Sequence, residues 1–261
     1  MGTTTVSLTE ADVCRALDVV IDPELDEPIT DLGFVRSVAV TAGHVEVHLR
    51  LPTSFCAPNF AYLMASDAKD ALHRLVAPGT VVVIELDDHH DSGIINAGLA
   101  ADAGYRGTFH HEAEHDLDDL RATFQRKAHT AAMERVLTAM LGSRPGMSEA
   151  ELGTLVLADL PSDEATAALL DRRAAIGLDT HPGSPVLVDE HGASYPVDKV
   201  PLALRRARST RISIEGNAHF CRGLLRTRYP ESGDDQAPRT EEAFGPRSPL
   251  TTLHRTEEQS A

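Results

Sequence analysis

The fold is decided by the stretch FVRSVAVTAGHVEVHLRL, residues 34–51. Apolar residues, mostly β-branched, alternate with polar ones over Phe34–Val40 and again over His44–Leu51, which is the pattern of half-buried strands. The three residues between the runs, Thr-Ala-Gly at 41–43, are a short turn that contains glycine. The two runs therefore predict an antiparallel β-hairpin.

Three further elements are expected around this hairpin. A helix over 8–20 has Thr9 as a suitable N-cap and ends before Pro23. A second helix over 58–75 carries apolar residues at helical spacing, and a continuous apolar run over 80–86 predicts a strand. The order α-β-β-α-β contains a βαβ unit, so its two strands should be parallel with a right-handed crossover. We therefore expect an α+β fold with a small, mixed three-stranded sheet.

This topology predicts that reactive residues gather at one edge of the sheet. The C-terminal ends of the two parallel strands share that edge with the start of the first strand, so Glu24, Asp31, Cys56, His89 and His90 should lie there. Thiolate, imidazole and carboxylate groups suit iron or zinc, and the N-terminus of the following helix favours a thiolate at Cys56. The alternatives are a small buried apolar cysteine, carboxylates that cap turns, and a solvated histidine turn.

The remainder of the chain is expected to be mainly helical. An apolar stripe that includes Leu117, Leu120 and Phe124 predicts a long helix over 116–141. From Tyr229 onwards the composition is polar and rich in proline, which predicts disorder. The other expected segments are an irregular link over 87–108, short helices over 149–175 and a hairpin over 185–195, while 205–225 stays ambiguous.

These expectations divide the chain into three parts. They are a compact α+β domain over 8–90, a mainly helical region over 91–228 and a disordered tail over 229–261.

Charge and composition argue against several classes of partner. The chain has 261 residues and a formal net charge of −16, which repels phosphate backbones, so we expect no nucleic-acid partner. No apolar run approaches the roughly 18 residues that span a bilayer, and the N-terminus lacks a signal pattern. We therefore expect a cytoplasmic, acidic protein with no membrane partner.

The cysteines restrict how a metal could be held. There are three of them, Cys14, Cys56 and Cys221, and no Cys-x-x-Cys occurs. The odd number and wide spacing argue against a disulfide framework, and the missing pair argues against a zinc knuckle or a four-cysteine cluster within one chain. Further ligands would have to come from a second subunit in a homodimer, from His, Asp or Glu, or from a small thiol.

A basic segment lies near the C-terminus. Residues 201–228 contain seven arginines and a single acid, Glu215. The plainer interpretation is a solvated helix face or a patch that docks onto the acidic remainder of the chain, and the sharper one is a surface for an acidic partner. Within this segment His219 and Cys221 could share a metal ion, with a buried structural cysteine as the alternative.

One motif favours a different class of function. His111-Glu112-Ala113-Glu114-His115 matches H-E-x-x-H, in which two histidines on a helix bind zinc and the glutamate is the general base. Glu134 lies downstream, where it could supply a third ligand. The surrounding glycines and aspartates are more typical of the start of a helix than of a buried catalytic helix.

Three motifs resemble the PaaD/SufT-type metal–sulfur cluster assembly family. They are the Asp-Pro-Glu turn at 22–24, the Asp-Leu-Gly-Phe-Val strand entry at 31–35, and the loop from Thr53 to Cys56 before the second helix. Ala57 separates Cys56 from Pro58, where the family has Cys-Pro, and the C-terminal cysteine cluster of PaaD is absent. The resemblance covers about residues 8–90, and residues 91–228 look like the extended bacterial forms that accompany di-iron monooxygenases.

The resemblance implies a non-enzymatic maturation factor. It would handle iron or an iron–sulfur cluster transiently, with Cys56 as the key thiol, and would metallate or chaperone a client iron enzyme together with other assembly proteins. The alternatives are a zinc-dependent hydrolase that uses His111, Glu112 and His115, and a metal-free protein adaptor.

Overall fold

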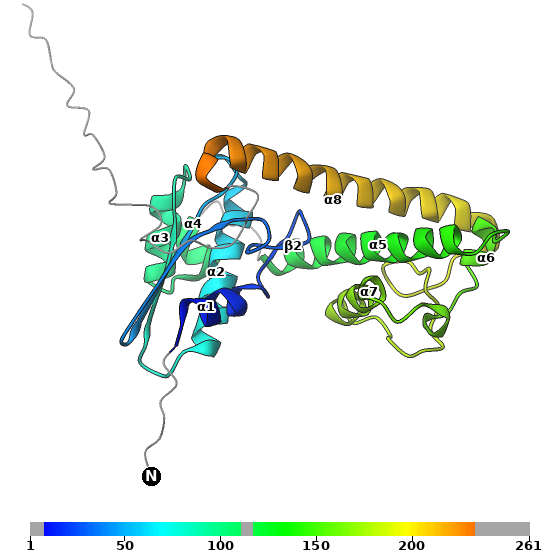
Figure 1. The fold of residues 1–261 in the computed structure, drawn as a ribbon, viewed down its shortest axis with the longest axis horizontal. Coiled ribbons are helices and arrows are strands. Elements are labelled where there is room, and N and C mark those ends of the chain that lie inside the picture. Colours follow the sequence, from blue (N-terminus) through cyan, green and yellow to red (C-terminus); the bar gives the residue numbers. More distant parts are fainter. Residues whose placement is uncertain (1–7, 111–116, 233–261) are drawn as a thin grey trace, which may run out of the picture.

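The computed structural model describes residues 8–110 and 117–232, and it confirms the expected α+β architecture. A small α/β unit is followed by a long helical arm, and the last helix returns along the arm to the α/β unit (Figure 1). The α/β unit has the predicted order α-β-β-α-β. Its elements are α1 (Glu10–Leu17), β3 (Val35–Thr41), β4 (His44–Leu49), α2 (Pro58–Leu75) and β5 (Val81–Leu86).

The sheet has the strand order β3-β4-β5. β3 and β4 are antiparallel and close at the pair Thr41↔His44, while β4 and β5 are parallel from His44↔Val81 to Leu49↔Leu86. Alternate residues of β4, among them Val47 at 0 % exposure, enter one hydrophobic core with α2. Burying one such side chain contributes about 1.5–3 kcal/mol.

Local signals explain where the helices begin. The Thr9 side chain accepts a hydrogen bond from the Asp12 N–H, and the Asp12 side chain accepts one from the Thr9 N–H, which is a complete capping box for α1. Pro58 is the first residue of α2, where its missing N–H costs nothing.

The Asp-Pro-Glu motif forms a tight turn before the sheet. It joins β1 (Ile21–Asp22) to β2 (Glu27–Pro28), which pair antiparallel. The Asp22 carboxylate accepts hydrogen bonds from the N–H groups of Glu24 and Leu25, both at 2.9 Å. This side chain therefore shapes the turn itself.

The helical arm has its own hydrophobic core. α5 (Leu117–Ser143), α7 (Glu164–Ala175) and α8 (Val200–Arg228) pack around it with α6 (Glu149–Leu152). At the start of α5 the expected apolar stripe packs inward: Leu117 is buried in the first core and Phe124 meets Phe60 edge to face at 5.0 Å. Short 3₁₀ turns complete the arm, at η2 (Leu157–Asp159), η3 (Val197–Lys199) and η4 (Pro230–Ser232).

The expected irregular link over 87–108 is wrong. Two helices lie there, α3 (Ser92–Ala100) and α4 (Gly104–Phe109). Gly98 permits their contact, since a Cβ at this position would lie 2.0 Å from Oγ1 of Thr108. A glycine needed for helix packing was thus interpreted as a sign of a loop.

Three other expectations need adjustment. The ambiguous stretch 205–225 is helical within α8, and the hairpin expected over 185–195 is reduced to one bridge between Val188 and Ser194. Disorder from residue 229 is wrong for its first four residues, because Tyr229 is 8 % exposed and η4 follows it. The rest of that segment, 233–261, lies outside the described residues. Among the residues described, no helix is both long and apolar enough to cross a bilayer.

Much of the basic segment docks onto its own chain. Arg208 and Arg211 both bind the carboxylate of Glu134, which is 1 % exposed between α5 and α8. Arg222 pairs with Glu27 of the β1–β2 hairpin. These contacts agree with the self-docking interpretation of the arginine-rich helix.

Candidate functional site

Two loops meet at the edge of the sheet where β4 and β5 end. We call this region the thiol edge and define it by residues 51–56 and 87–91. The His90 N–H donates to the Ser54 carbonyl at 2.8 Å, and Nε2 of His89 donates to the Cys56 carbonyl at 2.8 Å. The sequence therefore placed the cysteine and the histidine pair on adjacent loops correctly.

The cysteine is held by its own loop. Cys56 is half-buried two residues before α2, and its Sγ lies 3.6 Å from the Thr53 hydroxyl. The same hydroxyl accepts the Phe55 N–H at 3.2 Å, which fixes the turn. Thr53 thus supports the thiol and belongs to the loop motif that carries it.

The two histidines differ in their availability. His89 is 6 % exposed and has both ring nitrogens engaged, because Nδ1 accepts the Asp91 N–H at 3.1 Å while Nε2 donates to Cys56. His90 is exposed and stacks against Phe55, with the ring centroids 5.6 Å apart. His89 is therefore a support for the cysteine loop in this arrangement, and His90 is the imidazole open to solvent.

A buried carboxylate accompanies the thiol edge. Asp22 is 6 % exposed, and its burial raises its pKa to about 6 against the ordinary 3.8, although two backbone hydrogen bonds oppose that rise. The neighbouring Glu24 carboxylate adds a further upward push on this pKa, and Asn217 of α8 donates to Glu24 at 3.2 Å. A buried acid with a raised pKa is a group that a cation would stabilise.

The last helix brings a second thiol to this place. Cys221 on α8 packs against the same core as Cys56. In the sequence it lies between Asn217 and Arg222, which both bind the β1–β2 hairpin. Burial raises the pKa of Cys221 to about 11, with further contributions from the charges of Asp22, Cys56 and Glu24. The charges of Cys56 and of two carboxylates therefore reach Cys221.

A comparison with known families matches one part of the chain. Residues 10–86 match the model of the iron–sulfur cluster assembly protein family. We call them the assembly domain. The match supports a role in iron–sulfur cluster assembly. A search of curated proteins finds no match. The assembly domain runs from α1 to the end of β5 and includes Asp22, Glu24 and Cys56, whereas Cys221 lies outside it.

Two other candidate residues make no polar contact with the thiol edge. Asp31 and His219 are exposed and form no hydrogen bond or ion pair with the described part of the chain. His219 forms no hydrogen bond with Cys221, and the charges that act on Cys221 are those of Asp22, Cys56 and Glu24. The H-E-x-x-H residues His111, Glu112 and His115 lie outside the described residues.

The thiol edge is not a closed metal site in this arrangement. Within residues 8–110 and 117–232, no group of three or more His, Cys, Asp or Glu side chains is placed to hold a metal ion. Binding a metal or cluster would therefore require small side-chain movements, or ligands from a second molecule.

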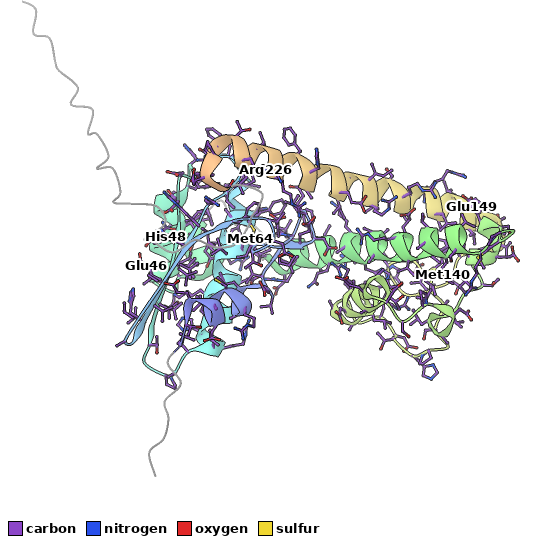
Figure 2. All side chains as sticks on the ribbon, viewed as in Figure 1. Glu46, His48, Met64, Met140, Glu149 and Arg226 are labelled. Carbon is purple, nitrogen blue, oxygen red and sulfur yellow. The ribbon has the colours of Figure 1, made fainter. Side chains whose placement is uncertain are left out.

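A charged network lies under the thiol edge. His48 and Glu46 both lie on β4 (Figure 2). His48 is buried, with Nδ1 3.0 Å from an oxygen of Asp87 and Nε2 3.0 Å from an oxygen of Glu46. Arg36 also donates to Asp87 at 2.8 Å. Burial alone would raise the pKa of Asp87, but His48 and Arg36 hold it below its ordinary value. The network fixes the end of β5, from which the His89 loop leaves.

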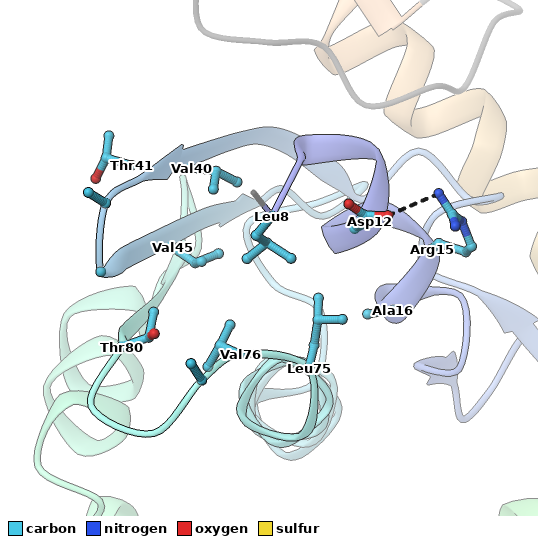
Figure 3. A pocket seen from close by; sticks show the side chains of 13 residues that line it. Leu8, Asp12, Arg15, Ala16, Val40, Thr41, Val45, Leu75, Val76 and Thr80 are labelled. Carbon is cyan, nitrogen blue, oxygen red and sulfur yellow. Dashed lines mark hydrogen bonds and ion pairs between the residues drawn. The ribbon is translucent and has the colours of Figure 1, made fainter. Parts of the chain in front are cut away.

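A large cavity lies at the opposite edge of the sheet. It measures about 1050 Å³ and lies between α1, the β3–β4 turn and the end of α2 (Figure 3). Leu8, Val40 and Leu75 give it an apolar wall, and Asp12 and Arg15 form an ion pair at 3.3 Å beside it. The described residues that line it include no cysteine and no histidine.

Two residues beside the thiol edge were missed by the sequence reasoning. Asp22 belongs to the quoted Asp-Pro-Glu turn, but Glu24 was chosen because nothing in the sequence shows which carboxylate is buried. Arg228 binds both loops of the thiol edge. It had no local signal, because it was one arginine among seven in a segment whose structure was left open.

Proposed function

We propose that this protein is a non-enzymatic assembly factor, which passes iron or an iron–sulfur cluster to a client iron enzyme or chaperones the client while it is metallated. The observation that carries the proposal is the match of residues 10–86 to the iron–sulfur cluster assembly family, together with the position of Cys56 at the edge of that domain. Its cargo is the metal or cluster itself.

The chemistry of the thiol edge supports this role. Cys56 and Cys221 offer sulfur, Asp22 and Glu24 offer oxygen, and this mixture suits iron. A bound cation would lower the raised pKa values of Cys221 and Asp22, and their protons would be released on binding. The raised pKa values therefore favour reversible binding, since the empty site stays largely protonated and uncharged at Cys221.

The hydrolase alternative has less support. Glu134, the residue that could complete the H-E-x-x-H site, is buried and bound by Arg208, Arg211 and Thr138. Burial by itself would raise its pKa, yet these hydrogen bonds hold it below the ordinary value. A carboxylate that already neutralises two arginines is a poor zinc ligand. The metal-free adaptor remains the competing proposal.

The proposed compartment and partners follow from the same chemistry. All three cysteines are free, which suits a reducing cytoplasm. The client is an iron enzyme, for which a di-iron monooxygenase is our specific candidate, and the missing ligands would come from the client, another assembly protein or a second copy of this chain.

The experiment compares Cys56→Ser with Cys14→Ser in cells that lack the native protein. Iron content and activity of iron–sulfur and di-iron enzymes are measured after complementation. We expect Cys14→Ser to restore both and Cys56→Ser to restore neither. Full restoration by Cys56→Ser would refute the thiol-dependent role and favour the metal-free adaptor.

A further inference from the structure

The last residues of α8 bind both loops of the thiol edge. Arg228 donates from Nη1 to the Leu51 carbonyl at 3.1 Å and from Nη2 to the Ser54 hydroxyl at 2.7 Å. Nη2 also donates to the Asp88 carbonyl, and the Tyr229 hydroxyl donates to the Asp88 carboxylate at 3.1 Å. One guanidinium thus joins the loop that leads to Cys56 with the loop that leads to His89.

These contacts lie on both sides of the thiol. Ser54 stands two residues before Cys56, and its carbonyl accepts the His90 N–H. Asp88 precedes His89, whose ring donates to the Cys56 carbonyl. The guanidinium therefore adds a further connection between two loops that these two hydrogen bonds and the stacking of His90 on Phe55 already join.

The end of α8 is itself firmly held. Leu225 is 1 % exposed and Tyr229 is 8 % exposed, and both belong to the core of the assembly domain. Arg50 is 4 % exposed, and its guanidinium lies 5.2 Å from the centre of the Tyr229 ring. Arg228 consequently acts from a fixed support, which is what holding a loop in one geometry requires.

We propose that Arg228 is a positioning residue for Cys56, supplied by the C-terminal helix to an assembly domain whose family match ends at residue 86. It holds the Cys56 loop against the His89 loop and so sets the exposure of the thiol. The proposal rests on the proposed function only in treating Cys56 as the functional thiol. The contact itself is tested without any client or metal.

The experiment measures the alkylation rate of each cysteine by mass spectrometry in the full chain, with Cys14 as the internal reference. Arg228→Ala should accelerate labelling of Cys56 about tenfold, the factor expected for losing a hydrogen bond to a charged group. Hydrogen exchange of the His90 amide, which bonds to Ser54, should quicken in parallel. Arg228→Lys should give an intermediate rate, because one of the contacts can be remade.

Two further variants make the result specific. Ser54→Ala removes one acceptor and leaves α8 intact, and it should accelerate Cys56 labelling less than Arg228→Ala does. The double variant should label Cys56 little faster than Arg228→Ala alone, because both substitutions remove the same hydrogen bond between Arg228 and Ser54. Arg205→Ala is the matched control, because Arg205 is exposed on the same helix and forms no hydrogen bond or ion pair with the described part of the chain.

Distinct results would overturn the proposal. Wild-type rates at Cys56 and His90 in both Arg228→Ala and Ser54→Ala would show that the contact does not position the loop. Equal acceleration of Cys56 and Cys14 in Arg228→Ala, with no effect of Ser54→Ala, would show a role in the whole fold instead. Neither result bears on the cellular test of Cys56→Ser, so the two proposals fail separately.

Discussion

Replacing Asp22 by asparagine should stabilise the protein at pH 8. The pKa of Asp22 rises from 3.8 to about 6 on folding, mainly through burial. Because the pKa of Asp22 is higher in the folded state, its protonation contributes to the free energy of unfolding. This contribution is fully present below pH 4 and is lost as the pH rises through about 6. At 1.36 kcal/mol for each pKa unit, ionisation costs at most about 3 kcal/mol above pH 7.

Asparagine removes this cost and keeps an acceptor oxygen for the N–H groups of Glu24 and Leu25. We expect Asp22→Asn to raise the free energy of unfolding by about 1–3 kcal/mol at pH 8 and to leave it nearly unchanged at pH 4. Urea unfolding at both pH values measures the difference.

The matched control is Asp31→Asn, at an exposed aspartate that forms no hydrogen bond or ion pair with the described part of the chain. It should change stability by less than about 0.5 kcal/mol at either pH. The reasoning would be refuted if the effect of Asp22→Asn on the free energy of unfolding were the same at pH 4 and pH 8, because the pKa of Asp22 would then not change on folding.

Three further results are expected. Leu225→Ala should lower the free energy of unfolding by about 2–5 kcal/mol, because this residue of α8 is buried in the core of the assembly domain. Leu202→Ala, at an exposed residue of the same helix, should lower it little. If urea unfolding showed similar losses for the two variants, α8 would not share the core of the assembly domain. The alkylation rate of Cys221 should rise roughly tenfold for each pH unit from 8 to 10, because the pKa of this thiol is about 11. Asp22→Asn should increase the rate, because the charge of Asp22 contributes to the raised pKa. A rate that reached a plateau near pH 9 would show that Cys221 has an ordinary thiol pKa. Metal analysis of His115→Ala should match wild type, and loss of stoichiometric zinc would favour the hydrolase.

The secondary structure of the α/β unit followed from local signals. The capping threonine, the Pro at the start of α2 and the alternating strands act over a few residues, so α2 was predicted with its observed bounds, Pro58–Leu75. The region 87–108 was misinterpreted because Gly98 serves a contact with Thr108, and that purpose is visible only in three dimensions.

The candidate site was predictable only where chain connectivity determines it. The right-handed βαβ connection predicted that Cys56 lies beside His89, because both residues follow parallel strands. It could not show that α8 returns from the far end of the arm to place Cys221 and Arg228 there. That return depends on packing of α8 against α5 and the assembly domain, which leaves no local trace in an arginine-rich segment.

The most direct test of the metal-handling role is protection of the thiols by iron. Cys14, Cys56 and Cys221 are labelled anaerobically with a small alkylating agent and quantified separately, with and without ferrous ion. We expect ferrous ion to slow labelling of Cys56 at least several-fold, EDTA to restore it, and Cys14 to be unaffected. Equal labelling of all three cysteines that does not depend on metal would contradict the account and leave Cys56 as a packing residue.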